Sequence, residues 1–332
     1  MLIVQTPLRM SFFGGGTDMK EYYENYGGTV ISTTFDKYCY HNVRNFPPFF
    51  ENRSQFTYSK IERFNSYDEV EHPAVRETLK YLNIRNIQIT YDADLPARSG
   101  LGTSSSFEVG LLNALHSLKG EFIDKMSLAK EAIYVERELC KEEGGVQDQL
   151  AVSIGGLNKY IFNSDGFSYN PIIISKERKK ELCDNLLLFF TGFTRFSSEI
   201  SKEQISNTKN KLNELHEIKN IVNEAEKILT SNCNLDEFGK LLDYNWRLKK
   251  TLAKSISNSD IDNLYEHIIR NGAVGGKLLG AGGGGFLLIY ANKELHDYIV
   301  GKTKLLHIPF EFESSGTKVI YYKPDKFDYL NK

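Results

Sequence analysis

Cysteine is scarce in this sequence of 332 residues, and its four copies lie far apart, with no Cys-x-x-Cys pair. This distribution argues against a zinc site and against a disulfide framework, and it indicates a reducing compartment. The seven histidines follow neither HxxH nor HExxH spacing, so we assign none of them a role. No apolar run reaches the length of a membrane span, and Arg9 interrupts the N-terminal stretch that a signal peptide would occupy. We therefore expect a cytoplasmic protein.

Neither sign of charge is in excess: 41 Lys and Arg residues stand against 43 Asp and Glu residues, for a net charge of −2. Proteins that bind nucleic acid or anionic membranes by electrostatics usually carry a basic excess. We therefore expect small-molecule partners, with no nucleic acid and no membrane among them. The length suffices for two domains, the 41% hydrophobic content is typical of a folded protein, and we find neither repeats nor a low-complexity linker. The oligomeric state stays open between a monomer and a homodimer.

Several well-known catalytic motifs are also missing. The sequence contains no GxxxxGK[ST] phosphate loop, no HRD or DFG of a protein kinase and no GxSxG nucleophile elbow. Gly280–Gly285 formally matches GxGxxG, but it precedes the apolar segment Phe286–Tyr290, which we expect to be a strand. A dinucleotide fingerprint must follow a strand and open a helix. The dehydrogenase interpretation is therefore weak.

Strand and helix patterns alternate irregularly along the chain. Thr29–Phe35 and Tyr38–Arg44 are rich in β-branched and aromatic residues, and we expect them to be two paired strands. A helix is predicted over Ser127–Cys140, with Ser127 as its N-cap, and a long polar helix over Ser197–Ile228. This mixed order favours an α+β fold over regular βαβ alternation. The charged segment Ser175–Cys183 interrupts two apolar strands and is the expected domain boundary.

A glycine-rich turn leads into a helix at Leu95–Leu115, which reads LPARSGLGTSSSFEVGLLNAL. Gly100 and Gly102 allow close approach of a ligand, and the hydroxyl residues Thr103–Ser106 stand where the helix should begin. The N–H groups and the dipole of a helix N-terminus attract anions, most often phosphate. The alternative is a Ser-capped surface helix that follows a loop, and this stretch alone does not decide between the two.

Two further glycine clusters flank this turn in the sequence. Gly14–Asp18 reads GGGTD and forms a loop that can wrap a small ligand, with Asp18 as its carboxylate. Asp18 could equally be the N-cap of the short helix expected after it. Gly282–Gly285 contains four consecutive glycines, more than one turn requires. We expect this backbone to pack closely against another backbone or a ligand.

The three clusters stand in a fixed order: PLRMSFFGGGTD at Pro7–Asp18, PARSGLGTSSS at Pro96–Ser106 and KLLGAGGGG at Lys277–Gly285, with GGVQDQ at Gly144–Gln149. In this combination the sequence resembles the GHMP small-molecule kinases over nearly its whole length. The resemblance implies a two-domain α+β fold. Its N-terminal ATP- and Mg²⁺-binding domain, a mixed α/β unit, would span residues 1–178, and a ferredoxin-like C-terminal domain would span residues 179–332.

The resemblance also implies ATP and Mg²⁺ as cofactors. The residues that would bind the ATP phosphates lie in the second motif, with the third closing over them: Ser99, Gly100, Leu101, Gly102, Thr103, Ser104, Ser105, Ser106, Gly282, Gly283 and Gly284. Ser104 and Glu136 match the family's magnesium ligands. Magnesium prefers oxygen ligands and keeps several waters, so one hydroxyl and one carboxylate suffice.

In the same way, Asp148 matches the catalytic aspartate of galactokinase-like members, and Arg9 matches the basic residue that pairs with it. We expect a contact between these two side chains. The implied substrate-binding residues are Gly15, Gly16, Thr17, Asp18 and Asp148. If the acceptor carries a distal phosphate, Arg98, Arg195 and Lys277 are candidates for binding it.

Each of these residues also has an ordinary structural explanation. Glu136 lies in YVERELCKEE, a charge-rich run that is usually the solvated face of a helix. Asp148 could be a helix cap after two glycines, and Arg9 could form a surface ion pair of little energetic value. Ser105 and Ser106 could serve as caps or in packing.

Within the family, the GGGTD, SGLGTSS and GGKLLGAGGGG versions of the motifs look most like those of heptose 7-phosphate kinases. The implied activity is ATP-dependent phosphorylation of the anomeric hydroxyl of D-glycero-D-manno-heptose 7-phosphate, for activated heptose and surface polysaccharide. Galactokinases have Glu-His where Gly15-Gly16 stand here, so galactose is not expected. The alternatives are another sugar 1-kinase, for fucose or an N-acetylhexosamine, and a non-catalytic sugar or nucleotide sensor.

Overall fold

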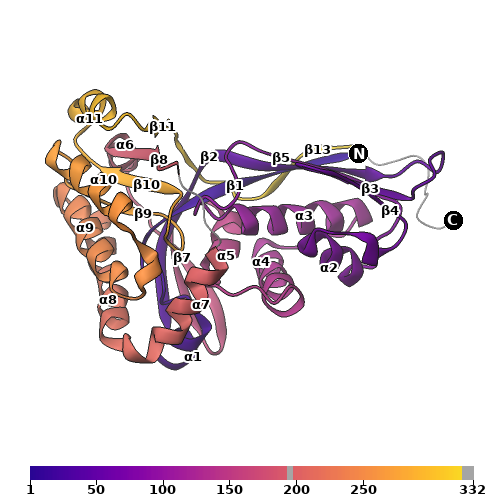
Figure 1. Cartoon of the computed structure of the whole chain (residues 1–332), viewed down its shortest axis with the longest axis horizontal. Coiled ribbons are helices and arrows are strands. Elements are labelled where there is room, and N and C mark those ends of the chain that lie inside the picture. Colours follow the sequence, from indigo (N-terminus) through magenta and orange to yellow (C-terminus); the bar gives the residue numbers. More distant parts are fainter. Residues whose placement is uncertain (193–196, 324–332) are drawn as a thin grey trace.

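The structure, a computed structural model, describes residues 1–192 and 197–323. The molecule is elongated (Figure 1): a long sheet with helices against one face extends to one end, and a smaller sheet with its own helices forms the other. Both termini of the described chain lie at the far end of the long sheet, where the backbones of Met1 and Lys323 bond to each other. The predicted α+β class is confirmed.

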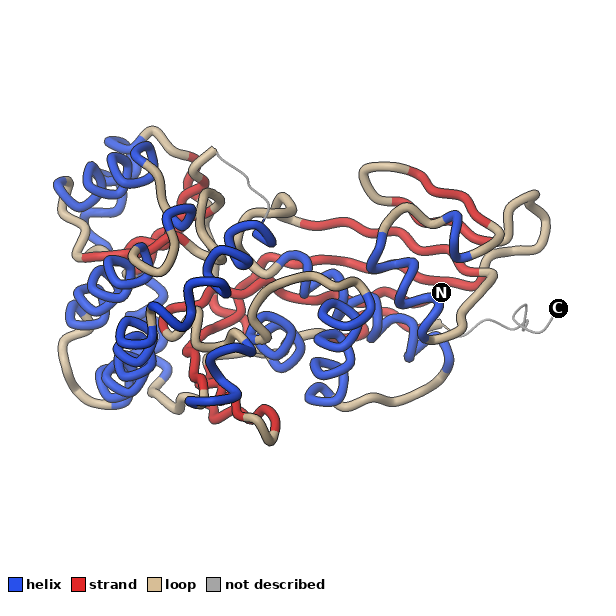
Figure 2. Tube along the Cα trace, turned by 60° about the horizontal axis from the view of Figure 1, so that its bottom comes forward, coloured by secondary structure: helices blue, strands red, loops and turns tan. Residues whose placement is uncertain are grey.

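Nine strands of the described residues form the larger sheet, and Figure 2 shows its longest part running along the molecule beside the helices. The main order is β13-β1-β2-β5-β3-β4, and β12 and β6 also pair with β2. The strands of this sheet are β1 (Leu2–Phe13), β2 (Gly28–Asn45), β3 (Ser54–Thr57), β4 (Ile61–Phe64), β5 (Ile87–Ala93), β6 (Asn158–Asn163), β7 (Gly166–Pro171), β12 (Phe312–Glu313) and β13 (Lys318–Tyr322).

The predicted pair of strands over 29–35 and 38–44 is wrong, because the structure has one strand, β2, across both. Both halves pair with β1, but the register shifts between Pro7, which faces Tyr38, and Leu8, which faces Phe35. Asp36 and Lys37 are therefore extra residues in a bulge, where the Asp36 N–H donates to Glu311 O at 2.9 Å. A bulge and a turn both interrupt the alternation of side chains, so the sequence pattern alone could not separate them.

Helix α3 is the central helix of the first part of the chain and packs against β1 and β2. Most of its residues are buried, from Thr103 to Leu115, because the sheet covers one side and other helices cover the rest. The helical elements of this part are α1 (Lys20–Tyr26), η1 (Tyr67–Glu69), α2 (Pro73–Tyr81), α3 (Thr103–Lys119), α4 (Lys125–Tyr134), the π-helical η2 (Val135–Leu139) and α5 (Gln147–Ile154).

The helix predicted over 127–140 begins earlier and changes character before its end. Its N-cap is Asp124, whose carboxylate accepts from the N–H groups of Met126 and Ser127, so the prediction of Ser127 as the cap is wrong. After α4 the backbone continues as η2, a short π-helical turn that carries Glu136. Such turns inside helices are frequent at functional sites.

The smaller sheet has the order β11-β8-β10-β9 and is antiparallel throughout. The elements of this part are α6 (Lys176–Asp184), β8 (Leu186–Phe190), α7 (Ser197–Asn207), η3 (Thr208–Asn210), α8 (Leu212–Thr230), α9 (Asp236–Lys250), η4 (Lys254–Ile256), α10 (Ser259–Arg270), β9 (Gly275–Leu278), β10 (Phe286–Tyr290), η5 (Lys293–Leu295), α11 (His296–Thr303) and β11 (Leu306–His307). The single helix predicted over 197–228 is wrong. It is broken at η3, which follows Asn207, whose side-chain amide donates to Leu252 O at 3.2 Å.

Aromatic residues join the two parts. Phe12 and Phe13 of β1 contact Phe238 of α9 edge to face, with ring centroids 5.3 and 5.0 Å apart. After β11 the chain returns to the larger sheet, where β12 pairs with β2 and β13 pairs with β1. The last strands of the segment 179–332 therefore belong to the first sheet, and the proposed division at residue 178 stays a prediction. No helix in the described part of the chain is long and apolar enough to cross a membrane.

Candidate active site

The second glycine motif forms the loop that leads into α3. Gly102 precedes the helix in the left-handed conformation, with φ 74°, which glycine adopts at little cost. The first backbone hydrogen bond of α3 runs from Ser106 N to Gly102 O. The N–H groups of Thr103, Ser104 and Ser105 come before this bond and face out of the helix end. No side chain caps this end. The geometry is that of an anion-binding helix N-terminus.

The hydroxyls of this motif have different surroundings. Ser104 is exposed, whereas Ser99, Thr103, Ser105 and Ser106 are buried. The Ser106 hydroxyl donates to Pro7 O at 2.9 Å, and the Ser99 and Thr103 hydroxyls lie 3.5 Å apart. Ser104 therefore keeps the hydroxyl that is most open to a ligand.

The third motif packs directly on the second. A Cβ at Gly280 would overlap the backbone of Gly100, so these two backbone segments lie too close together for a side chain to fit between them. Beyond this contact, Gly283 N donates to Ile256 O at 2.9 Å, which ties the glycine run to η4. The expected close packing of backbone on backbone is confirmed. The roles of Gly282, Gly283 and Gly284 toward a nucleotide stay predictions.

Arg9 and Asp148 form the expected contact. Arg9 lies on β1 and Asp148 in the first turn of α5, and the guanidinium donates to the two carboxylate oxygens at 2.8 and 2.6 Å. Arg9 Nη1 also donates to Gly100 O at 2.6 Å, and Arg9 N donates to Leu101 O at 3.1 Å. The Arg9 side chain is 4% exposed and that of Asp148 is 24% exposed, so the carboxylate keeps an open side. The explanations by a helix cap and by a surface ion pair do not apply.

Asp18 holds the first motif to the start of α5. Its carboxylate accepts from Gly16 N at 2.9 Å and from Gln147 Nε2 at 2.9 Å. It does not cap α1, whose N-cap is Met19. The Thr17 hydroxyl donates to the carbonyls of Gly14 and Thr29 and accepts from Thr29 N. Thr17 therefore shapes the loop, and Asp18 ties the loop to α5.

Glu136 is buried, at 3% exposure, so its interpretation as part of a solvated helix face is wrong. Gln149 Nε2 donates to Glu136 Oε2 at 2.6 Å, while Glu136 Oε1 has no partner among the described residues. Burial raises the pKa of Glu136 to about 7. A buried carboxylate oxygen without a donor is costly unless a cation or a ligand approaches it.

The donor set of Ser104 and Glu136 fits Mg²⁺ by its chemistry. Both offer hard oxygen ligands, one from an exposed hydroxyl and one from an orphaned buried carboxylate oxygen. Within residues 1–192 and 197–323, no group of three or more His, Cys, Asp or Glu residues could hold a metal ion. An ion at this place would thus depend on ATP phosphates and water for its remaining ligands.

Two buried lysines lie near these groups. Lys249 was not among the predicted site residues, and Lys277 was predicted as a candidate ligand of a distal phosphate. Lys249 of α9 is 6% exposed and donates to Gly280 O at 2.7 Å. It follows Leu242 and Trp246 at helical spacing, and a lysine on an apolar stripe was a signal that could have found it. Lys277 of β9 is 1% exposed and donates to Ser11 O and Phe12 O at 2.8 and 3.0 Å.

The three candidates for a distal phosphate meet different outcomes. Lys277 is engaged by backbone carbonyls inside the protein, so its prediction as a phosphate ligand is not supported. Arg98 is exposed and lies within the second motif, in the loop before α3. Arg195 lies outside the described residues.

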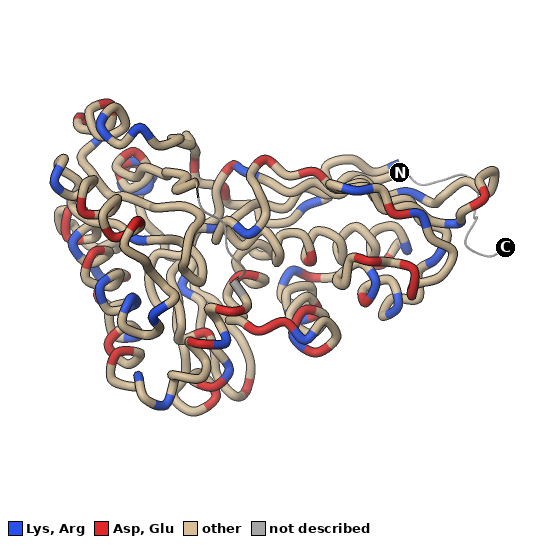
Figure 3. Tube along the Cα trace, viewed as in Figure 1, with Lys and Arg blue, Asp and Glu red and all other residues tan. Residues whose placement is uncertain are grey.

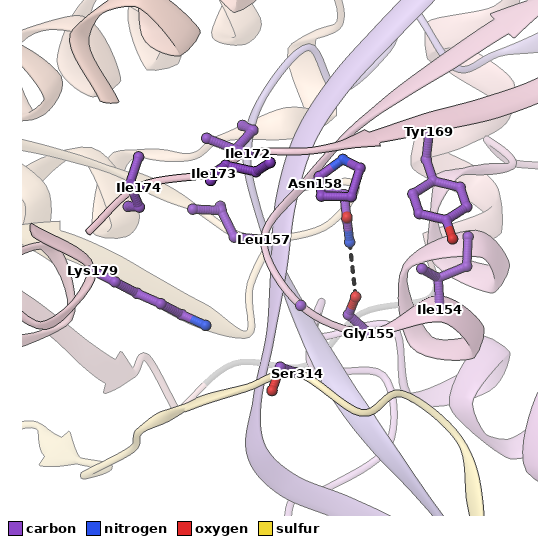
Figure 4. A pocket seen from close by; sticks show the side chains of 12 residues that line it. Ile154, Gly155, Leu157, Asn158, Tyr169, Ile172, Ile173, Ile174, Lys179 and Ser314 are labelled. Carbon is purple, nitrogen blue, oxygen red and sulfur yellow. Dashed lines mark hydrogen bonds between the residues drawn. The ribbon is translucent and has the colours of Figure 1, made fainter. Parts of the chain in front are cut away.

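A cavity of about 400 Å³ lies elsewhere (Figure 4). Ile172, Ile173 and Ile174 line one side of it, and Asn158 and Lys179 supply polar groups. None of its lining residues belongs to the three glycine motifs. It is not the site of the Arg9–Asp148 pair.

Lys, Arg, Asp and Glu are interspersed along the chain in Figure 3. This mixture agrees with the net charge of −2. The positive charge at the candidate site is therefore local and comes from a few buried side chains.

Two family models match this chain: the GHMP kinases N terminal domain over residues 70–156 and the GHMP kinases C terminal domain over residues 229–297. The chain therefore belongs to the GHMP kinases and is a phosphotransferase. GHMP kinases use ATP, so this part of the cofactor prediction follows from the family.

Within this family, the chain is similar to the D-glycero-alpha-D-manno-heptose 7-phosphate kinase of Campylobacter jejuni. The two are 29% identical over 304 residues, which span 87% of this chain and 88% of that protein. The L-fucokinase/L-fucose-1-P guanylyltransferase of Bacteroides fragilis is 30% identical over 234 residues, or 68% of this chain and 24% of that protein. A solved D-glycero-D-manno-heptose 1-phosphate kinase from Bacteroides thetaiotaomicron shares the fold, with a TM-score of 0.81 at 22% identity, covering 97% of this chain and 100% of that chain.

Proposed function

We propose that this protein is an ATP- and Mg²⁺-dependent sugar kinase. Its acceptor would be D-glycero-D-manno-heptose 7-phosphate, phosphorylated on the anomeric hydroxyl to the 1,7-bisphosphate. The observation that carries the proposal is the Arg9–Asp148 pair, whose guanidinium also bonds Gly100 O of the phosphate loop. One arginine thus joins the residue that would accept the substrate's proton to the loop that would hold ATP.

In the proposed reaction, the anomeric oxygen of the sugar attacks the γ-phosphorus of ATP. Asp148 accepts the hydroxyl proton as the new P–O bond forms, and ADP leaves with the electrons of the broken bond. Arg9 orients Asp148 and lies where charge on the transferring group develops. Phosphoryl transfer depends mainly on positioning and charge neutralisation, which agrees with a site built from backbone N–H groups and few side chains.

For the metal, Ser104 and Glu136 would hold Mg²⁺ beside the phosphates, where the ion neutralises charge on the β- and γ-oxygens. Gly15, Gly16 and Asp18 would face the sugar. The predicted place of action is the cytoplasm, where ATP is supplied, and the product would serve activated heptose for surface polysaccharide.

The heptose acceptor draws its support from the similarity to the Campylobacter jejuni kinase over 87% of the chain. A second candidate, a free sugar such as fucose, is favoured by the 30% identity to the Bacteroides fragilis fucokinase. The test is ADP release with a panel of heptose 7-phosphate, fucose, galactose and N-acetylhexosamines. We expect the highest kcat/KM for heptose 7-phosphate and an anomeric phosphate signal in ³¹P NMR. Turnover of a free sugar without turnover of the heptose phosphate would contradict the narrow proposal.

A non-catalytic sensor would bind ATP and sugar but release no ADP above background. The Asp148→Asn variant provides the background in the same assay. Equal ADP release by the wild-type protein and this variant, on every sugar of the panel, would favour the sensor and overturn the kinase proposal for this chain.

A further inference from the structure

Lys249 extends from α9 toward the first glycine motif, and nothing in the proposed reaction uses it. A Cβ at Gly15 would lie 3.5 Å from Lys249 Nζ and 3.7 Å from Gln147 Nε2. Because Gly15 has no side chain, this space is left to the two donors. We infer that Lys249 binds an oxygen of the acceptor sugar, next to the oxygen held by Asp18; this inference rests on the proposed sugar kinase function.

The hydrogen bonds of Lys249 are incomplete. Its ammonium has three N–H donors, and Gly280 O is its one hydrogen-bond partner in the described chain. The side chain is nevertheless buried, at 6% exposure. An ammonium held away from water with open donors needs an acceptor, and the neighbouring glycine backbone leaves room for one.

Two more buried polar atoms beside the same glycines lack partners. Gln147 Oε1 has none in the described structure, and neither has Gln204 Nε2 of α7. The Gln204 amide borders Gly16, since a Cβ there would lie 2.9 Å from its Nε2. Buried polar groups are almost always paired in folded proteins, so three open groups around one glycine pair indicate a polar ligand.

The chemistry of these groups suits a polyol. A carboxylate such as Asp18 can only accept hydrogen bonds, and an ammonium can only donate them. A sugar hydroxyl does both, so neighbouring hydroxyls can donate to Asp18 and accept from Lys249. Gln147 Oε1 adds one more acceptor for a sugar hydroxyl, and Gln204 Nε2 adds one more donor.

Lys277 is the internal contrast. It is equally buried, but its ammonium donates to two backbone carbonyls of β1, Ser11 O and Phe12 O, and so it is a structural residue. Lys249 also remains a cation near neutral pH, since its pKa is lowered only to about 8. Burial lowers this pKa most, Arg9 lowers it further, and the Asp18 and Asp148 carboxylates raise it. The groups that act on it are thus Asp18, Asp148 and Arg9, and burial lowers the pKa of the neighbouring Lys277 well below its usual range.

The test is Lys249→Met, which keeps the length of the side chain and removes its donors. We expect the acceptor KM to rise roughly 10- to 100-fold, in line with the loss of a charged hydrogen bond, while the KM for ATP stays within about twofold. The matched control is Lys250→Met on the same helix, whose ammonium pairs with Asp262 at 2.9 Å and lies over the Trp246 ring. We expect this control to leave both KM values unchanged.

A fold check and a second variant separate binding from structure. Replacement of a buried charge by an apolar residue of similar size is often tolerated, and circular dichroism and thermal melting report folding directly. Lys249→Gln keeps a donor and should recover part of the acceptor affinity. In the wild-type protein the acceptor KM should rise above pH 8, as the ammonium loses its proton, and this rise should be absent in Lys249→Met.

Three results would overturn the inference: an unchanged acceptor KM in folded Lys249→Met, a rise confined to the KM for ATP, or a loss confined to kcat. The last two would assign Lys249 to the nucleotide or to the transferring phosphoryl group. No turnover of any sugar by the wild-type protein would overturn the proposed function together with this inference. Wild-type turnover with unchanged acceptor KM in the variant would overturn the inference alone.

Discussion

Two carboxylates on helical segments that follow one another in the chain have different surroundings. Asp148 is bound by both arms of the Arg9 guanidinium and keeps 24% of its side chain exposed. Glu136 receives one neutral amide from Gln149, has an oxygen without a partner and is almost completely buried. Asp148 is thus hydrogen-bonded directly by its counter-charge, whereas Arg137 Nη1 lies 3.6 Å from Glu136 Oε2 and Glu136 Oε1 has no partner among the described residues.

This difference agrees with the roles proposed for the two groups, a proton acceptor for Asp148 and a metal ligand for Glu136. A charged partner keeps a carboxylate oriented, which suits a base that must be in place before the substrate arrives. A carboxylate whose pKa is raised to about 7 by burial can gain its counter-charge from a bound cation. The contrast yields four tests, which begin with the largest expected effect.

Asp148→Asn should have the largest effect, because it removes the proposed proton acceptor without changing the shape of the side chain. We expect kcat to fall about 10²- to 10⁴-fold. The Kd for ATP, measured by calorimetry, should stay within about threefold. An unchanged kcat would remove Asp148 as the base and leave its pairing with Arg9 without a catalytic meaning.

Arg9→Met should disturb both the acceptor side and the ATP side, because Arg9 bonds Asp148 and Gly100 O. We expect kcat to fall roughly 100-fold through misplacement of Asp148 and the free energy of unfolding to drop by about 2 kcal/mol. Arg247→Ala is the control, since its pair with Asp243 is largely exposed and should contribute less than about 1 kcal/mol. Chemical denaturation and steady-state kinetics measure both. Equal effects of the two substitutions would mean that the Arg9 pair is an ordinary ion pair.

Glu136→Gln should raise the Mg²⁺ concentration for half-maximal activity about 10-fold or more, since an amide is a poor ligand for a hard cation. Activity is titrated with Mg²⁺ at constant free ATP. Glu138→Gln, in the same helical turn but exposed, is the matched control and should leave the titration unchanged. A wild-type titration curve for Glu136→Gln would exclude Glu136 as a ligand.

The smallest expected effect is on the pH dependence of stability. Burial raises the folded pKa of Glu136 from 4.5 to about 7, so between these values the folded protein binds a proton that the unfolded chain has lost. Its contribution to stability is therefore present below pH 4.5 and is lost as the pH rises through 7. Glu136→Gln should be more stable than the wild type at pH 8, measured in urea without Mg²⁺, with little difference at pH 4.5. A difference that does not vary with pH would contradict the protonated state of Glu136.

Much of the fold followed from local patterns, and the failures have specific causes. The helix at 103–119 begins where the glycine-rich turn predicts it, and the strand at 286–290 lies where the apolar segment predicts it. The pairing of 29–35 with 38–44 failed because a bulge at Asp36 and Lys37 interrupts the alternation as a turn does. The Ser127 cap failed because Asp124, three residues earlier, is the stronger acceptor at that helix end.

The site was predicted unevenly for a different reason. The glycine motifs and the contact between Arg9 and Asp148 could be expected from the motifs and the family they resemble. Burial could not: Glu136 lies in a charge-rich run that is typical of a surface, yet it is buried in the folded chain, where Gln149 of another helix bonds it. Lys249 was missed for the same reason, although its place after Leu242 and Trp246 on an apolar stripe was visible.

By itself, the sequence determined the class of the protein and the positions of its glycine-rich turns, because glycine runs and helix starts act over a few residues. The tertiary structure alone decided which charges are paired and which are left open. Arg9 and Asp148 are 139 positions apart, and Lys249 bonds a carbonyl 31 positions away. Burial and electrostatic interaction depend on distance in space, which residue order does not contain.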